Sequence, residues 1–216
     1  MNSTPFIAVE GPIGVGKTSL SHRLATYLQF HLLREIVEEN PFLKDFYQNI
    51  DEWSFQTEMF FLCNRYKQLE DVEARFLTKQ KPVVADYHVL KNIVFAKRTL
   101  HMKHYNKYER VYKVLTEDLP MPNIIVYLNA SLETLLKRIS KRGRDIEQDI
   151  NHTYLLNLKE DYEKMFVQFK QEHPHIPVLE FDGDKIDFVN QEEDFQHIID
   201  ILKPALLKEF PNEFKR

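Results

Sequence analysis

The chain is poor in cysteine, in net charge and in long apolar runs, and each shortage excludes a class of protein. Its 216 residues include one cysteine, Cys63, so no internal disulfide can form, and we expect a reducing, cytoplasmic setting. Because Cys63 follows an apolar run, we predict that it is buried as a small hydrophobic residue. The formal net charge of −4 provides no basic field for nucleic acid or an acidic membrane surface.

No apolar stretch approaches the length of a membrane span, and a strand-like run begins close to the N-terminus. We therefore expect neither a membrane anchor nor a signal peptide. The hydrophobic fraction of 43% is sufficient for a sizeable core, and the length predicts one domain over residues 1–216.

Glycine is also scarce, with five in the chain, and three of these lie in one segment that fits the phosphate-binding pattern G-x-x-x-x-G-K-[ST]. An apolar run, Phe6–Val9, precedes this segment, and a helical pattern from Ser19 to Gln29 follows it. Glycines allow backbone N–H groups to converge on phosphate oxygens at a helix N-terminus. We predict that Lys17 reaches the β- and γ-phosphates of ATP and that Thr18 binds Mg²⁺. The predicted ATP-binding loop is Gly11, Pro12, Ile13, Gly14, Val15, Gly16, Lys17 and Thr18.

The rest of the chain alternates strand-like runs with helical patterns, which predicts an α/β fold: a five-stranded parallel sheet with helices on both faces. The predicted strands are Phe6–Val9, Phe30–Leu33, Pro82–Ala85, Ile124–Leu128 and Val178–Phe181. The later helices are predicted at 53–80, 89–104, 107–115, 131–141, 151–171 and 191–202, with Ser131 and Asn151 as N-caps and Pro204 ending the last helix. Ligands of such sheets bind at the carboxyl ends of the strands.

Three kinds of phosphate-binding protein fit this fold: a GTPase switch, an ATPase motor and a small-molecule kinase. A GTPase requires Asp-x-x-Gly and Asn-Lys-x-Asp motifs, which the sequence lacks. After the fourth predicted strand the chain instead carries a run of cations, Lys137, Arg138, Lys141, Arg142 and Arg144. Arginines that close over a transferring phosphoryl group can neutralise its charge, so we predict an arginine-rich lid at about residues 141–150 of a P-loop kinase. The alternative is a solvated helix face.

These segments, taken in order, resemble the deoxyribonucleoside kinase family over nearly the whole chain. The resemblance rests on the glycine loop, Arg34–Pro41, Trp53–Phe55, the strand ending in Asp86, and Arg142–Arg144. The Glu-Glu-Asn-Pro run within 34–41 is most similar to bacterial members that phosphorylate deoxyadenosine or deoxyguanosine. The resemblance implies transfer of the γ-phosphate of ATP to the 5′-hydroxyl of a deoxyribonucleoside, and a homodimer.

The resemblance also implies roles for two carboxylates at strand ends. Glu35 is expected to contact the 5′-hydroxyl as general base, although a surface glutamate is the alternative. Asp86 is expected to bind Mg²⁺ together with Thr18. Where the family carries an arginine after this acidic residue, the chain has Tyr87 followed by His88, so another cation or a hydrogen bond from Tyr87 would have to replace it.

Other site residues follow from the same resemblance. Tyr47 and Glu147 are expected at the sugar 3′-hydroxyl, and Trp53 and Phe55 at the base, where an ordinary core role is the alternative. The remaining implied positions are Arg138, Arg142 and Arg144 at the transferred phosphate, and Asp187 and Phe188 at the base of ATP.

The clearest departure from the family pattern is Glu58, which stands where the family carries a base-reading glutamine. An ionised carboxylate only accepts hydrogen bonds, and guanine presents two adjacent donors, so Glu58 favours deoxyguanosine. Arg65 lies on the same helix face and could donate to guanine O6, with Asn92 on the opposite wall. If Glu58 were instead exposed, the base would be read elsewhere, and a deoxyadenosine or deoxycytidine kinase would remain possible.

Two rival functions remain. A nucleoside monophosphate kinase requires cations for the acceptor's phosphate, whereas the region after the second predicted strand is acidic. A non-catalytic nucleotide-binding subunit would not require the carboxylates Glu35 and Asp86 at strand ends.

Overall fold

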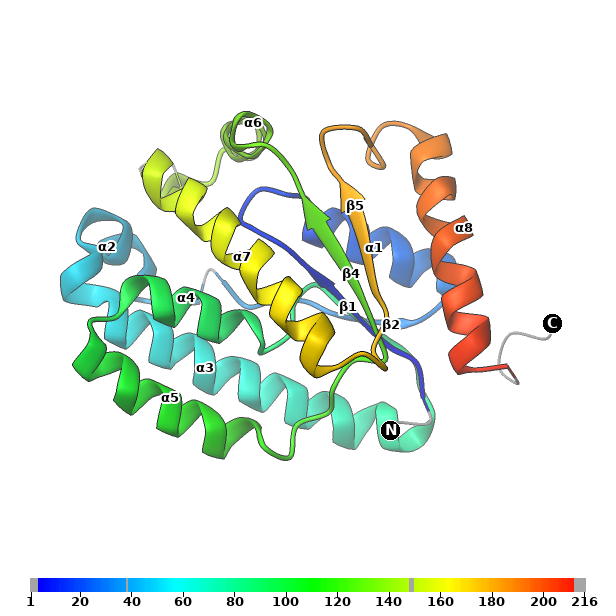
Figure 1. The fold of residues 1–216 in the computed structure, drawn as a ribbon, viewed down its shortest axis with the longest axis horizontal. Coiled ribbons are helices and arrows are strands. Elements are labelled where there is room, and N and C mark those ends of the chain that lie inside the picture. The colour runs from blue at the N-terminus through cyan, green and yellow to red at the C-terminus, as the bar shows by residue number, and fades with distance from the viewer. Residues whose placement is uncertain (1–3, 38, 148–149, 212–216) are drawn as a thin grey trace.

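The computed structural model describes residues 4–37, 39–147 and 150–211, which form a parallel five-stranded sheet between helices (Figure 1). The strand order is β2-β3-β1-β4-β5, and every neighbouring pair is parallel. The strands are β1 (Phe6–Glu10), β2 (His31–Leu33), β3 (Val83–Ala85), β4 (Ile124–Asn129) and β5 (Val178–Asp182). The predicted α/β class, with five parallel strands, is confirmed.

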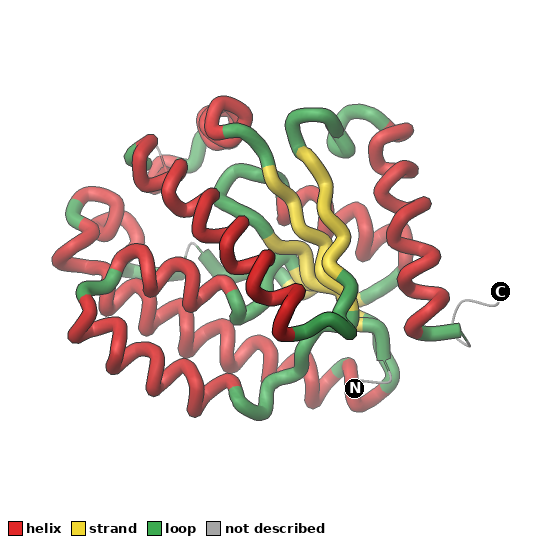
Figure 2. The backbone as a smooth tube through the Cα atoms, viewed as in Figure 1, coloured by secondary structure: helices red, strands yellow, loops and turns green. Residues whose placement is uncertain are grey.

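Helices cover both faces of this sheet. In Figure 1, α7 crosses in front of the strands with α4, α3 and α5 beside it, whereas α1 lies behind; Figure 2 shows the same layering as a tube. The α-helices are α1 (Lys17–Leu28), α2 (Leu43–Gln48), α3 (Ile50–Arg75), α4 (Lys91–Thr99), α5 (Met102–Thr116), α6 (Leu132–Arg142), α7 (His152–Glu172) and α8 (Glu192–Glu209). Two 3-10 turns, η1 (Leu77–Lys79) and η2 (Asp145–Glu147), complete the described elements.

The central strand β1 is buried along its whole length because both of its faces are covered. Side chains alternate across the sheet. Phe6 accordingly packs with residues of α3, α4 and α5 such as Leu62, whereas Ile7 and Val9 pack in the larger cluster that contains residues of α1, α7 and α8. The polar Glu10 at the end of β1 is also buried, with one carboxylate oxygen accepting from the His88 N–H at 2.6 Å.

The predicted N-caps of two helices are confirmed. The Ser131 hydroxyl accepts from the Thr134 N–H before α6, and the Asn151 side chain accepts from the Tyr154 N–H before α7. These bonds satisfy amides that a helix start would otherwise leave unpaired. They also fix where α6 begins relative to the carboxyl end of β4.

Four details of the prediction are wrong. The helix α2 was not predicted. The helix predicted over 89–104 is broken at residues 100–101, where α4 ends and α5 begins. Pro204 lies within α8 and does not end it: a proline removes one backbone hydrogen bond, but Leu206 and Phe210 beyond it are buried and favour continuation of the helix to Glu209. Cys63 is exposed, because the inward face of α3 at this point is occupied by its neighbours Phe61 and Leu62.

No helix in the described part of the chain is both long enough and apolar enough to cross a bilayer. Of the predicted lid segment 141–150, residues 148 and 149 lie outside the described residues. The remainder of that segment comprises the end of α6, the turn η2 and the residues that lead into α7.

Candidate active site

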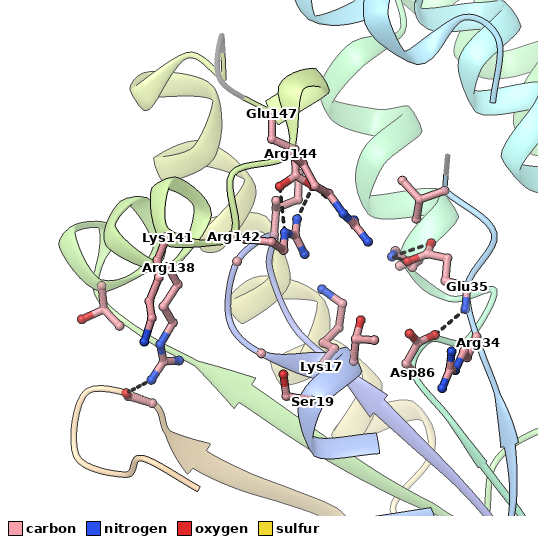
Figure 3. A pocket seen from close by; sticks show the side chains of 18 of the residues that line it. Lys17, Ser19, Arg34, Glu35, Asp86, Arg138, Lys141, Arg142, Arg144 and Glu147 are labelled. Atoms are coloured by element: carbon pink, nitrogen blue, oxygen red, sulfur yellow. Dashed lines mark hydrogen bonds and ion pairs between the residues drawn. The ribbon is translucent and has the colours of Figure 1, made fainter. Parts of the chain in front are cut away.

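A cavity of about 1180 Å³ lies at the carboxyl ends of the strands. The glycine loop, the segment after β2, parts of α2, α3 and α4, the end of α6, and the loop after β5 all line it. In Figure 3, the pair Glu35 and Asp86 lies on one side of Lys17, and Arg142 and Arg144 lie above it. The topology therefore gathers charged groups of both signs at this edge of the sheet.

The glycine loop adopts backbone conformations that other residues resist. Gly11 has φ +147°, and a Cβ there would lie 2.2 Å from the Leu128 carbonyl oxygen. Gly16, at φ +107°, precedes α1, so the loop leads directly into a helix N-terminus. The Lys17 Nζ donates to the carbonyl oxygens of Gly11 and Pro12 at 2.7 and 2.9 Å. Burial and the charge of Lys91 lower the pKa of Lys17 to about 7.

Glu35 follows β2 and enters a cluster of cations. Its carboxylate accepts from the Lys91 Nζ at 2.8 and 2.9 Å and from the Arg65 Nε at 3.1 Å. Burial raises the pKa of the Glu35 carboxyl, but the charges of Lys91 and Arg65 outweigh burial and hold that pKa well below its usual range. Glu35 is therefore an ionised, immobilised carboxylate in the cavity wall.

Asp86 follows β3 and links this cluster to α1. Its Oδ1 accepts from the Glu35 N–H at 2.6 Å, and its carboxylate is also hydrogen-bonded to the Thr18 hydroxyl. Burial and the nearby charge of Glu35 raise the pKa of Asp86. Thr18 and Asp86 thus bring two hard oxygen donors together beside Lys17. Mg²⁺ prefers this kind of donor, and it commonly takes only one or two protein ligands beside substrate phosphates.

Glu58 on α3 is buried in the cavity wall, and the possibility that it is exposed is excluded. The residue is 2% exposed. Its Oε1 accepts from the Thr99 hydroxyl at 3.3 Å, whereas Oε2 has no hydrogen-bond partner within the described residues. Burial raises the pKa of the Glu58 carboxyl to about 7, against the opposing charge of Arg65. An unpaired buried carboxylate oxygen facing a cavity is costly unless a ligand supplies a donor.

Arg65 connects Glu35 to the buried residues behind the cavity wall. Besides Glu35, it donates from Nη1 to the Asn92 Oδ1 at 2.9 Å, and the Asn92 amide in turn donates to the Tyr108 hydroxyl. Asn92 is fully buried behind the cavity wall and orients Arg65. It does not face the space where a base would lie.

Four aromatic residues were predicted at the substrate, and of these Tyr47 lines the cavity, whereas Trp53, Phe55 and Tyr87 do not. Trp53 stacks on Phe42, and Phe55 packs in the cluster beneath α3 and α5. Tyr87 is fully buried and donates from its hydroxyl to the Gln68 Oε1 at 2.7 Å, so it is a core residue in this structure. The aromatic side chains that do line the cavity are Phe46, Tyr47, Phe61, Phe95, Tyr154 and Phe188.

The two arginines of the predicted lid, Arg142 and Arg144, contact the same carboxylate. Arg142 donates from Nε to Glu147 at 3.0 Å, and Arg144 lies 3.5 Å from the same carboxylate. Tyr47 lies close enough for the charge of Glu147 to add to burial in raising the pKa of the Tyr47 phenol. Glu147 and Tyr47, predicted together at the sugar, therefore share one end of the cavity.

Arg138 joins the glycine loop to the loop after β5. It donates to the Val15 carbonyl and the Gly183 carbonyl, each at 2.8 Å. Asp187 and Phe188 both line the cavity, and the Phe188 ring packs against Gly16, where a Cβ would approach it to 3.0 Å. Most of the predicted ATP-binding residues therefore line the cavity, whereas Gly11, Pro12 and Val15 do not.

Comparison with known proteins identifies the family. Residues 7–206 match the model of the family described as "Deoxynucleoside kinase". The chain belongs to the deoxynucleoside kinase family. It is 52% identical over 207 residues to a deoxyguanosine kinase of Bacillus subtilis (strain 168), covering 96% of this chain and all of that one. It is 29% identical over 199 residues to a deoxyadenosine/deoxycytidine kinase of the same organism, covering 90% of each chain.

The fold of this deoxynucleoside kinase also resembles solved structures. A structure titled as deoxyadenosine kinase from M. mycoides with bound dATP superposes with a TM-score of 0.78 at 25% identity, covering 92% of this chain and 99% of that one. Both the family resemblance and the P-loop kinase fold predicted from the sequence are therefore confirmed.

Lys91 is a charged residue of this site that was not predicted from the sequence. A signal for it existed: the family arginine is absent at Tyr87, and a lysine, Lys91, follows four residues later. No motif marked it, because its contact with Glu35 joins two segments far apart in the chain.

Proposed function

We propose that the protein transfers the γ-phosphate of ATP to the 5′-hydroxyl of deoxyguanosine, giving dGMP and ADP. Family membership and the 52% identity to a deoxyguanosine kinase support this assignment. Deoxyadenosine or deoxycytidine is the alternative acceptor, since a relative named for those substrates matches at 29% identity.

The observation that carries the guanine assignment is the unpartnered Oε2 of Glu58 in the cavity. Guanine offers its N1–H and its amino group side by side, and a carboxylate accepts both at once. Adenine would direct the lone pair of its N1 at a carboxylate oxygen and lose one hydrogen bond, a mismatch of about 1–3 kcal/mol in a buried site. Arg65 has five N–H donors, and those not bonded to Glu35 and Asn92 can reach for guanine O6.

Catalysis of phosphoryl transfer requires mainly that the reacting groups are positioned and that the charge on the phosphates is neutralised. Glu35 accepts the 5′-hydroxyl proton as the hydroxyl oxygen bonds to the γ-phosphorus and the β,γ-bridging bond breaks. The low pKa of Glu35 then favours release of that proton to water. Lys17, Arg142 and Arg144 neutralise charge on the phosphates, and Glu147 holds the two lid arginines until the lid closes. Tyr47 and Glu147 hold the 3′-hydroxyl.

Thr18 and Asp86 would hold the Mg²⁺ that accompanies ATP. The ion would neutralise charge on the β- and γ-phosphates. The described residues contain no cluster of three or more His, Cys, Asp or Glu that could hold a metal. Such a site fits an ion held chiefly through the nucleotide. We further propose that the protein is a cytoplasmic homodimer, with neither nucleic acid nor membrane as a partner.

Steady-state kinetics with four deoxynucleosides and ATP test the assignment. We expect the largest kcat/KM with deoxyguanosine, and ADP release that depends on the nucleoside. In Glu58→Gln, the preference for deoxyguanosine over deoxyadenosine should fall roughly 5- to 150-fold, because glutamine restores a donor for adenine N1. Deoxyadenosine or deoxycytidine as the best substrate of the unmodified protein would refute the guanine assignment. An unchanged preference in Glu58→Gln would remove Glu58 from base reading, and nucleoside-independent ADP release would favour the rival functions.

The choice between purines should depend on pH. Because its pKa is raised to about 7, the Glu58 carboxyl is ionised above this pH and protonated below it. The protonated carboxyl offers one hydrogen-bond donor and one acceptor, as the glutamine amide does. Arg65, Lys91 and the Thr99 hydroxyl oppose this shift without abolishing it. We expect the ratio of kcat/KM for deoxyguanosine to that for deoxyadenosine to rise as pH increases through about 7. In Glu58→Gln the same ratio should stay constant, and a parallel rise in both proteins would contradict this role of Glu58.

A further inference from the structure

The ammonium of Lys91 is a buried charge that neither the glycine loop nor the lid explains. The side chain is 5% exposed and lines the cavity, and Nζ donates to both oxygens of Glu35. Removing an ammonium from water is costly, and pairing with a carboxylate offsets that cost only where the geometry is good. The contribution of Lys91 to the cavity is therefore its positive charge.

The position of Lys91 in its helix is unfavourable for a cation. Lys91 is the first residue of α4, and the first turn of that helix carries no acidic residue. A positive charge at a helix N-terminus is destabilised by the helix dipole. Local helix energetics therefore do not account for the lysine, whereas its contact with Glu35 does.

Two cations contact the single carboxylate of Glu35. Arg65 and Lys91 both form ion pairs with it. Phosphoryl transfer places negative charge on the oxygens of the transferring group, next to the hydroxyl that Glu35 is proposed to deprotonate. An ammonium has three N–H donors, and the two hydrogen bonds to Glu35 use two of them.

Two hydrogen bonds between uncharged groups fix the backbone next to Glu35. Tyr87 donates to Gln68, and the Gln68 amide donates to the Arg34 carbonyl oxygen at 2.9 Å. These two hydrogen bonds position the end of β2 but bring no charge to the cavity. Tyr87 and Gln68 therefore position the backbone next to Glu35, whereas Lys91 supplies the positive charge beside its carboxylate.

We propose that Lys91 is a catalytic residue that orients Glu35 and donates its third N–H to an oxygen of the transferring phosphoryl group. This inference rests on the proposed kinase function. As the 5′-oxygen bonds to the γ-phosphorus and the bond to the ADP oxygen breaks, the proton passes to Glu35, and Lys91 remains protonated throughout. Lys91 thus stabilises charge and does not transfer a proton.

The test compares Lys91→Met with Lys91→Arg, using Lys97→Met as the matched control on the exposed face of the same helix. We expect Lys91→Met to lower kcat for deoxyguanosine by about 10²–10³-fold, the cost of removing one preorganised donor. The KM for ATP should stay within a few-fold, because Lys17 and the glycine loop remain. Lys91→Arg should recover part of kcat, and Lys97→Met should match the unmodified protein.

Thermal unfolding of each variant separates catalysis from folding. A structural lysine would lower the unfolding temperature and leave kcat per folded molecule unchanged, and that result would overturn the proposal. If Lys91→Met does not fold, Lys91→Gln retains a donor to Glu35 without the charge, and an undiminished kcat in that variant would also overturn it. Failure of the proposed function is distinguishable, because the unmodified protein would then phosphorylate no deoxynucleoside.

Discussion

Replacing Glu35 with glutamine is expected to lower kcat by about 10²–10⁴-fold, the usual contribution of a positioned general base. The amide occupies the same space but cannot accept the 5′-hydroxyl proton. Lys91, Arg65 and Asp86 would still surround the side chain or its backbone, so the binding of both substrates should change far less than kcat.

The measurement is steady-state kinetics together with calorimetric binding of deoxyguanosine. The matched control is Glu193→Gln, an exposed glutamate in the first turn of α8, which should retain full activity. A kcat within tenfold of the unmodified protein would remove Glu35 from the role of general base. Circular dichroism is needed in parallel, because Glu35→Gln leaves two buried cations without their carboxylate.

Replacing Lys17 with methionine should lower kcat by about 10²–10³-fold and weaken ATP binding. The ammonium lies on the carbonyls of Gly11 and Pro12 and can exchange these acceptors for β- and γ-phosphate oxygens. Although its pKa is lowered to about 7, a triphosphate beside it would favour the charged form. The effect should therefore appear both in kcat and in the KM for ATP.

The control for this variant is Lys103→Met, an exposed lysine on α5. Binding of deoxyguanosine alone should be preserved in Lys17→Met, since the predicted base contacts at Glu58 and Arg65 lie elsewhere in the cavity. Loss of ATP binding without any loss in kcat at saturation would show that Lys17 binds ATP but does not stabilise the transferring phosphoryl group.

The parts of the molecule that could be predicted from sequence are those determined by neighbouring residues. The glycine loop, the five strands and the caps at Ser131 and Asn151 each follow from a short segment and its period. The burial of Glu58 could not be inferred in this way, because it depends on where α3 packs against α4. For the same reason, the sequence did not show that Tyr87 is buried in the core and that Trp53 packs outside the cavity. Whether an aromatic residue faces the cavity depends on the packing of the helices and not on its place in a motif.

Pro204 and Cys63 illustrate two further limits. A local rule ends a helix at proline, but the buried side chains beyond Pro204 decide the outcome. An apolar run suggests burial of Cys63, but a helix turns each residue by about 100°, so a residue next to buried ones can face water. In both cases the tertiary environment outweighs composition.

The helix α4 connects the two ends of the proposed nucleoside site. Its first residue, Lys91, contacts Glu35, and its last, Thr99, contacts Glu58. Because a helix rises by about 1.5 Å per residue, the length of α4 fixes the distance between the phosphate end and the base end of the cavity. Inserting one residue into α4 would rotate one end against the other by about 100°, so the two ends could no longer be in register with the same substrate. The length of this helix thus sets the size of the molecule that the cavity can accept.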